Sequence, residues 1–287
     1  MEENKLNNWI IHVMLYLIIA VIFDQTYKIA TKKMKKPGAL TVLLEILASI
    51  LVLVLCPFFE VKFPTDLKVY LFLGLSIIFY AITDRLNTTV RKGIEASTFS
   101  IIKQLSTVFM TFSGFLFFKE PFVISKFIGA FLIIFSNIII FYKKGDGKVN
   151  KYVALGIVSN LCYTIALFLD VNYSENFNLP FYVMLTLGIP AILIILIERI
   201  KLSDLKNEFT KENRIPILVT SITWSFCIVA QLRAYQLGNV SVVAPLCSLI
   251  VIINVIVGYF CLKEKDNLLR KIIAACLIIL GIILIKG

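Results

Sequence analysis

Ten long apolar runs, separated by short charged gaps, constrain the fold of this 287-residue chain more than any other feature. A bilayer core about 30 Å thick needs roughly 20 apolar residues per helix, and each run is about that long. The runs are continuous rather than alternating, which excludes a transmembrane β-barrel. We therefore predict an all-α membrane protein with ten transmembrane helices. The predicted spans are 9–30, 39–59, 69–87, 96–118, 122–142, 152–171, 179–199, 215–235, 240–262 and 268–285.

The composition agrees with this prediction and removes several classes of function. With 59% apolar and only 16% charged residues, the chain has too little polar surface for a water-soluble domain, so its surface is predicted to contact the lipid bilayer. The formal charge of +11 predicts no nucleic-acid partner, because the Lys and Arg residues sit in the gaps between the runs. Six cysteines without a CxxC pair, and the single histidine His12, predict no disulfide, metal site or cofactor.

Lys and Arg are distributed unequally between the gaps. The gaps after odd-numbered spans hold 21 of them, against 7 in the termini and the remaining gaps. Because cytoplasmic loops are enriched in Lys and Arg, the odd-numbered gaps, which include 32–36, 143–144 and 201–214, are predicted to face the cytoplasm. Both termini then lie outside, in a multi-pass protein of the cell (inner) membrane.

The chain contains an internal repeat with an offset of 144 residues. At this offset the Lys-Glu pair at 119–120 aligns with the pair at 263–264, and Gly114 aligns with Gly258. Each unit contains five predicted spans, an odd number, so the second unit enters the membrane in the opposite orientation. Inverted repeats are typical of secondary transporters, which bind substrate near the membrane midplane. The two units are residues 1–146 and 147–287.

Two motifs, one in each unit, carry a family resemblance. The first runs from Ile94-Glu95-Ala96-Ser97 through Lys103-Gln104-Leu105-Ser106 to Gly114 and Lys119-Glu120-Pro121. The second runs from Gly238-Asn239-Val240-Ser241 through Ala244-Pro245-Leu246 to Gly258 and Lys263-Glu264. Together they resemble the paired motif of the EamA-type family in the drug/metabolite transporter superfamily, and the resemblance covers essentially the whole chain.

The motifs are diagnostic of the fold of this family, but they say little about the substrate. It implies that the first four spans of each half line a cavity, while the fifth spans are peripheral and contribute to a homodimer. It also implies that both termini lie in the cytoplasm, the reverse of what the Lys and Arg distribution predicts. The superfamily includes exporters of amino acids and metabolites, carriers of sugars and nucleotide sugars, and drug efflux proteins.

Ionisable residues inside the predicted spans are the first candidates for a site. A charge at membrane depth costs about 2.5–3.5 kcal/mol, so it is retained only with a partner or a water-filled cavity. Asp24, Glu45 and Lys103 each lie six or seven residues from a span end on the side of the odd-numbered gaps, at a depth of roughly 9–11 Å. This shared depth predicts one cluster that binds an ionised ligand and a proton. A structural network of ion pairs is the alternative, and Asp84 with Arg85 is expected to form a pair at the rim.

The second half offers fewer charges. Asp170 begins the segment 170–173, which resembles 24–27, and the inverted orientation places it near the opposite face. Gln104 lies beside Lys103, and Gln231 matches Asn87 at the repeat offset. Four aromatic residues, Tyr80, Tyr163, Trp224 and Tyr235, are candidates for the walls of a cavity, and Tyr80 and Trp224 are the predicted site residues among them. Helix-to-helix hydrogen bonds and core packing are the alternatives for this polar and aromatic set.

The predicted function is secondary active transport of a small organic metabolite such as an amino acid. We expect an exporter that works by alternating access, with a proton coupled through Glu45 or Asp24 and with Lys103 as the anchor for an anionic group. No nucleotide-binding motif is present, so the chain is not expected to be an ATP-driven pump. A channel or a non-transporting scaffold remains the alternative. An intramembrane enzyme is less favoured, because one histidine and separated carboxylates form no catalytic arrangement.

Overall fold

A computed structural model of the chain describes residues 2–117, 123–141, 150–263 and 268–286, and within these residues it is helical with no strand. Six of the described helical segments are long and apolar enough to cross a membrane. They are Trp9–Lys32, Pro37–Phe58, Leu67–Gly93, Lys151–Asn176, Leu179–Glu198 and Arg214–Leu237. The charged motif residues at 119–120 and 264, and the predicted cytoplasmic residues at 143–144, lie outside the described residues.

The helices follow one another with short connections. In the first half they are α1 (Glu2–Lys32), α2 (Pro37–Val52), the 3-10 helix η1 (Leu53–Phe58), α3 (Leu67–Gly93), α4 (Ala96–Ile102), α5 (Gln104–Leu116) and α6 (Ile124–Phe141). In the second half they are α7 (Lys151–Tyr173), η2 (Ser174–Asn176), α8 (Leu179–Glu198), α9 (Leu202–Glu208), α10 (Arg214–Leu237), α11 (Val240–Cys247), α12 (Ile250–Cys261) and α13 (Leu268–Lys286).

Polar residues in the gaps fix where several helices begin. The side chain of Asp66 accepts a hydrogen bond from the second residue of α3, and that of Asn150 does the same for α7. Asn178 caps α8 by accepting from the backbone N–H of Phe181. Such caps satisfy N–H groups that have no partner within the helix. The apolar runs therefore start as helices at defined residues.

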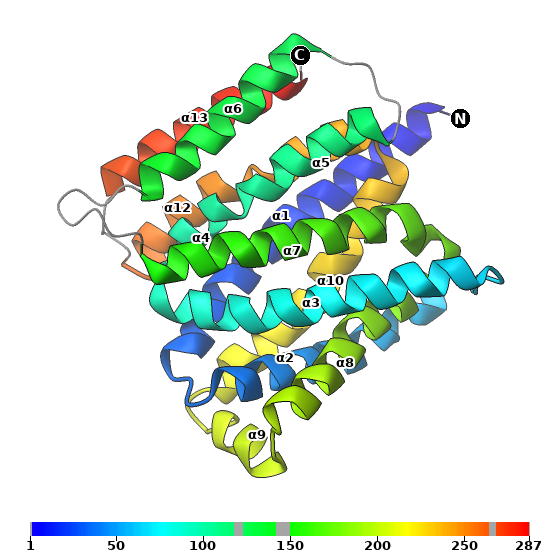
Figure 1. Ribbon diagram of the computed structural model, residues 1–287, viewed down its shortest axis with the longest axis vertical. Coiled ribbons are helices and arrows are strands. Elements are labelled where there is room, and N and C mark those ends of the chain that lie inside the picture. The colour runs from blue at the N-terminus through cyan, green and yellow to red at the C-terminus, as the bar shows by residue number, and fades with distance from the viewer. Residues whose placement is uncertain (1, 118–122, 142–149, 264–267, 287) are drawn as a thin grey trace.

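The helices of the two halves pack as counterparts of one another. α2 packs against α8, and α6 packs against α13 along one edge of the molecule (Figure 1). The contact of α1 with α10 is matched by that of α7 with α3, so exchanging the halves preserves the pattern. α2 and α8 run antiparallel, because Gly38 lies beside Glu198 and Ser49 beside Gly188. Equivalent helices thus run in opposite directions where they meet.

Two predicted spans are each broken into two helices. The segment predicted at 96–118 is interrupted at Lys103, between α4 and α5, and the segment at 240–262 is interrupted between α11 and α12. The breaks come at nearly the same place in the repeat, since position 247 matches Lys103 at the offset of 144. A hydrogen bond between the hydroxyls of Thr107 and Ser248 joins the two broken helices beside their breaks.

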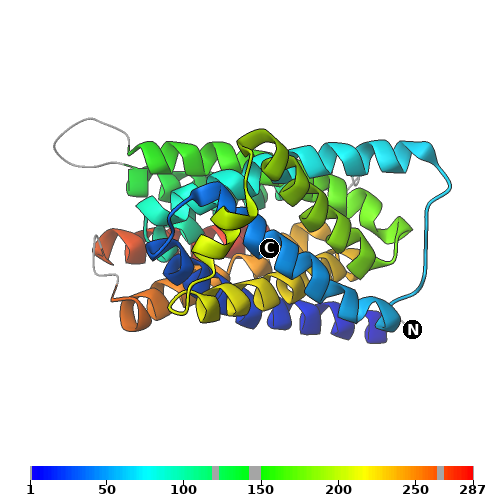
Figure 2. The same ribbon diagram turned by 90° about the horizontal axis from the view of Figure 1, so that it is seen from below.

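The fold also differs from the prediction at the end of α3. This helix continues to Gly93, beyond the predicted end at Asn87, and so includes Arg91. The buried ammonium of Lys28 donates hydrogen bonds to the backbone carbonyls of Arg91 and Ile94, both at 2.5 Å, and ties α1 to the C-terminal end of α3. Figure 2 shows α1 and α3 along opposite sides of the molecule, with α2 and α8 between them.

Candidate functional site

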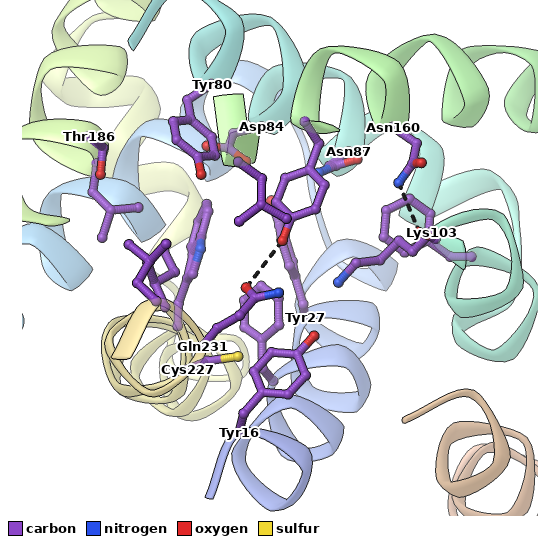
Figure 3. Close-up of a pocket in the computed structure, with 18 of the residues that line it drawn as sticks. Tyr16, Tyr27, Tyr80, Asp84, Asn87, Lys103, Asn160, Thr186, Cys227 and Gln231 are labelled. Carbon is purple, nitrogen blue, oxygen red and sulfur yellow. Dashed lines mark hydrogen bonds between the residues drawn. The ribbon is translucent and has the colours of Figure 1, made fainter. Parts of the chain in front are cut away.

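A cavity lies between the helices of the two halves. It has an empty volume of about 840 Å³, counting the part that is open to solvent. α1, α3, α7, α8 and α10 form most of its wall, and Lys103 enters at the break between α4 and α5 (Figure 3). Its lining consists of Tyr16, Phe23, Tyr27, Tyr80, Asp84, Asn87, Arg91, Phe99, Lys103, Asn160, Tyr163, Leu167, Thr186, Leu187, Trp224, Cys227, Ile228, Gln231 and Leu232.

Many of the lining residues occupy equivalent positions in the two repeats. Ten of the lining residues form five pairs separated by 144 positions, so corresponding residues of the two halves face one cavity. The pairs are Tyr16 with Asn160, Phe23 with Leu167, Tyr80 with Trp224, Asp84 with Ile228 and Asn87 with Gln231. The cavity therefore lies where the two halves meet, which is the usual place for the substrate site of a transporter with inverted repeats.

Lys103 is the cation that this cavity presents without a counter-ion. Its side chain is partly exposed and reaches into the cavity from the break between α4 and α5 (Figure 3). Within the described part of the chain its ammonium has no ion pair or hydrogen bond, and the nearest aromatic contact is the ring of Tyr163, 6.0 Å from Nζ to centroid. The backbone carbonyl of Lys103 accepts a hydrogen bond from Asn160 at 3.4 Å. The break thus directs a free positive charge into the cavity.

Aromatic rings form much of the cavity wall. The ring of Trp224 on α10 packs against those of Phe23 and Tyr27 on α1, with centroids 5.5 and 5.9 Å apart. The hydroxyl of Tyr163 donates to Gln231 Oε1 at 3.2 Å, as drawn in Figure 3. These side chains offer an apolar surface with a few polar groups, the usual lining of a site for a small organic molecule.

Asp24 lies behind the cavity wall, and both oxygens of its carboxylate have partners. Its carboxylate forms an ion pair with Arg91, and the two side chains are 1% and 2% exposed. Asn254 on α12 donates to the same carboxylate at 2.7 Å, and in turn accepts from Gln25 at 3.0 Å. The guanidinium of Arg91 also lies over the Phe99 ring, 4.2 Å from its centroid. This network joins α1, α3 and α12 beside the cavity, which Arg91 and Phe99 also line.

Glu45 is paired with a different residue. It is completely buried, and no hydrogen-bond donor of the described residues reaches either carboxyl oxygen. Its neighbour is the carboxyl group of Asp84, which lines the cavity. The prediction of a rim pair between Asp84 and Arg85 is wrong, because Arg85 instead pairs with Glu198 at the end of α8.

Asp170 on α7 lies beside α3 and is not itself a lining residue, although its partner Tyr80 is. Its buried carboxylate accepts hydrogen bonds from the hydroxyls of Ser76, Tyr80 and Tyr182 at 2.6, 2.6 and 2.7 Å. Ser76 lies 15 residues before Arg91 on α3, about 22 Å along the helix. Asp170 and Asp24 therefore belong to separate polar clusters.

The structure gathers some of the predicted site residues and separates others. Lys103, Tyr80, Trp224 and Gln231 line the cavity together. Gln104 lines a small adjoining pocket and donates a hydrogen bond to the backbone carbonyl of Ser100 on α4, across the break at Lys103. The expected contact cluster of Asp24, Glu45 and Lys103 does not form, because equal depth places residues at one level and leaves the direction of each side chain open.

Sequence reasoning named Tyr163 among the aromatic candidates for the cavity wall, and the structure places it there, but it did not single out Arg91. Arg91 follows the apolar part of α3 and lies beyond the predicted end of the span at residue 87. Aromatic residues are common throughout the chain, so the sequence does not distinguish those that line the cavity from the others. No pattern in the sequence indicates the contacts that bury the side chains of Lys28 and Arg91. Among the described residues no group of three or more His, Cys, Asp or Glu is placed to hold a metal ion.

Comparison with known proteins gives two findings. A family model described as "EamA-like transporter family" matches the chain twice, over residues 9–142 and 150–287. One solved structure, described only as the crystal structure of a protein, has a similar fold with a TM-score of 0.61, over 96% of this chain and 98% of that chain. Its sequence is 12% identical, so the likeness concerns the fold alone. No curated protein matches the sequence.

Proposed function

We propose that this chain, which belongs to the EamA-like transporter family, is a secondary active transporter that moves a small organic anion or zwitterion, such as an amino acid, across the cell membrane. The coarser conclusion, a membrane transporter of the drug/metabolite transporter superfamily, follows from the family match over both halves. The charge of the solute follows from the site.

The observation that carries the proposal is the free ammonium of Lys103 in the cavity. A cation at this depth is costly unless it has a partner or water, and the described residues give it no partner. A carboxylate on the solute would supply the missing counter-charge. The rings of Trp224 and Tyr27 would then contact the apolar part of the same molecule.

The fold suggests how such a solute would move. We propose ten transmembrane spans in two inverted units, 1–146 and 147–287, that rock about the cavity between them. The network of Asp24, Arg91 and Asn254 beside the cavity would act as a gate at one end. Access from that side would require α12 to leave α1, which breaks the contacts of Asn254 and leaves the ion pair within the first half.

A native cysteine allows a direct test. Cys227 lines the cavity beside Trp224 and Gln231, so a ligand in the cavity should shield its thiol. A variant that keeps Cys227 as its single cysteine would be purified and treated with methyl methanethiosulfonate. The compounds added would be benzoate, phenylalanine and phenethylamine, which share an aromatic ring and differ in charge. Benzoate and phenylalanine should slow the modification, and phenethylamine should not.

Lys103 variants identify the anchor in the same assay. Lys103→Met should abolish the protection, whereas Lys103→Arg, which keeps the positive charge, should retain part of it. Compounds that protect would then be loaded into proteoliposomes to measure flux against a gradient. Equal protection by the cationic amine, or protection by benzoate that survives in Lys103→Met, would contradict an anionic site at Lys103. Flux that only follows the solute's own gradient would favour a channel.

A further inference from the structure

Two acidic residues on neighbouring helices face one another beside the cavity. The hydroxyls of Thr41 on α2 and Thr88 on α3 are hydrogen-bonded at 2.6 Å. Glu45 lies one turn after Thr41, and Asp84 lies one turn before Thr88, so helices with this antiparallel contact place the two carboxyl groups together. The direct interaction of the Glu45 and Asp84 carboxyls agrees with this register.

The surroundings of this carboxyl pair favour a shared proton. Glu45 is 0% exposed and Asp84 is 6% exposed, and both oxygens of Glu45 lack a donor in the described part of the chain. Two buried carboxylates in contact repel one another and lose hydration, so both cannot be ionised at once. A proton held between the two groups removes the repulsion and supplies the missing hydrogen bond.

The charged and polar groups around the Glu45–Asp84 pair come from α1, α3, α8 and α10. From α1 the pair meets Tyr27, and from α3 it meets Arg91, whose charge Asp24 already balances. On the α8 side, Glu198 contacts Gly38, seven residues before Glu45. On the α10 side, hydroxyl groups donate to backbone carbonyls of α2. The fields of two cations, Arg91 and Lys103, act on the Asp84 carboxyl, and of these two Lys103 is the one without an ion pair among the described residues.

We propose that the Glu45–Asp84 pair carries the coupling proton of transport, and that Lys103 links this proton to the solute. In the empty site the ammonium of Lys103 favours the state in which the pair holds one proton and one negative charge. When a solute carboxylate neutralises Lys103, that support is lost and the pair takes up a second proton from water. Anion and proton therefore bind together, and by reciprocity each strengthens the binding of the other.

This inference rests on the proposed function, because a coupling proton presupposes transport of a solute. Its first test needs no solute. Infrared difference spectra of the purified protein, recorded as the pH is changed, report the carbonyl stretch of protonated carboxyl groups. The wild type should show such a band at neutral pH, and Glu45→Gln or Asp84→Asn should each remove it. Asp24→Asn and Asp170→Asn are matched controls that should retain it, because both carboxylates are stabilised by charged or hydroxyl donors.

Lys103→Met tests the link. The variant imitates the neutralised lysine, so the second protonation should move toward higher pH by about one unit or more. An unchanged titration in Lys103→Met, or a band that survives in both Glu45→Gln and Asp84→Asn, would overturn the inference. If one of the two acid variants fails to fold, the other and Lys103→Met still decide the result.

A second measurement separates this inference from the proposed function. Benzoate added to the weakly buffered protein should bind with uptake of protons, and its affinity should rise as the pH falls, by up to about tenfold per pH unit for one linked proton. Binding of benzoate with no uptake of protons would overturn the coupling and leave the anionic site standing. An infrared band at the pair without benzoate binding would support the shared proton and count against the solute class.

Discussion

Replacing Arg91 by Met is expected to destabilise the protein far more than replacing Lys103 by Met. Both are cations at the cavity, but the guanidinium of Arg91 is 2% exposed and paired with Asp24. Removing one member of a buried ion pair costs about 3–5 kcal/mol, because the other charge stays buried without compensation. Lys103 has no ion-pair partner in the described residues, so its loss should change the free energy of unfolding by less than about 1 kcal/mol.

Unfolding by sodium dodecyl sulfate in mixed micelles, followed by tryptophan fluorescence, measures the difference. The double variant Asp24→Asn with Arg91→Met removes both charges and keeps an amide for Asn254 to bind, so it should recover at least half of the loss seen in Arg91→Met alone. Equal losses for Arg91→Met and Lys103→Met would refute the assignment of one cation to structure and the other to the solute. So would a double variant as unstable as the single one.

Three further changes test other parts of the structure. Tyr182→Phe removes one hydrogen-bond donor to the Asp170 carboxylate. It should lower the free energy of unfolding by about 1.5–3 kcal/mol in the same assay, because a hydrogen bond to a charged group contributes about that much. A loss below about 0.5 kcal/mol, the usual effect of a surface substitution, would contradict this. Gly281→Leu should destabilise the contact of α13 with α6, because a Cβ there would lie 2.6 Å from a backbone oxygen of α6; a neutral effect would show that these helices separate freely. A cysteine at Lys62 should react with an impermeant maleimide in intact cells, and one at Lys211 should not, if the odd-numbered gaps are cytoplasmic; the reverse pattern would show the opposite orientation.

The overall helical arrangement could be predicted because it depends on quantities that are local in the sequence. The length of each apolar run sets a helix that can cross the bilayer, and the repeat offset is visible in the residues themselves. The same offset matches Tyr80 with Trp224 and Asn87 with Gln231 in the cavity, which the sequence could suggest only as pairs of positions. Whether the chain has ten spans stays a prediction.

The partners of the buried charges could not be predicted in the same way. Counting residues from the end of a span gives the depth of a side chain, but the direction around the helix depends on how neighbouring helices rotate and pack. Asp24 and Glu45 share a depth, yet one turns toward Arg91 and the other toward Asp84. The break at Lys103 follows no glycine or proline, so no local rule placed it there.

The cavity is symmetric in position but not in charge, and this difference limits what it can bind. At the repeat offset Asp84 matches Ile228, which also lines the cavity, and the position that matches Lys103 is Cys247. The first half thus contributes both the free cation and the carboxyl pair, while Trp224 and Ile228 of the second half give an apolar wall. A symmetric scaffold lets both sides of the membrane reach one site by related motions, whereas recognition needs two unlike ends. The solute that we propose has its anionic group beside Lys103 and its apolar body against the second half.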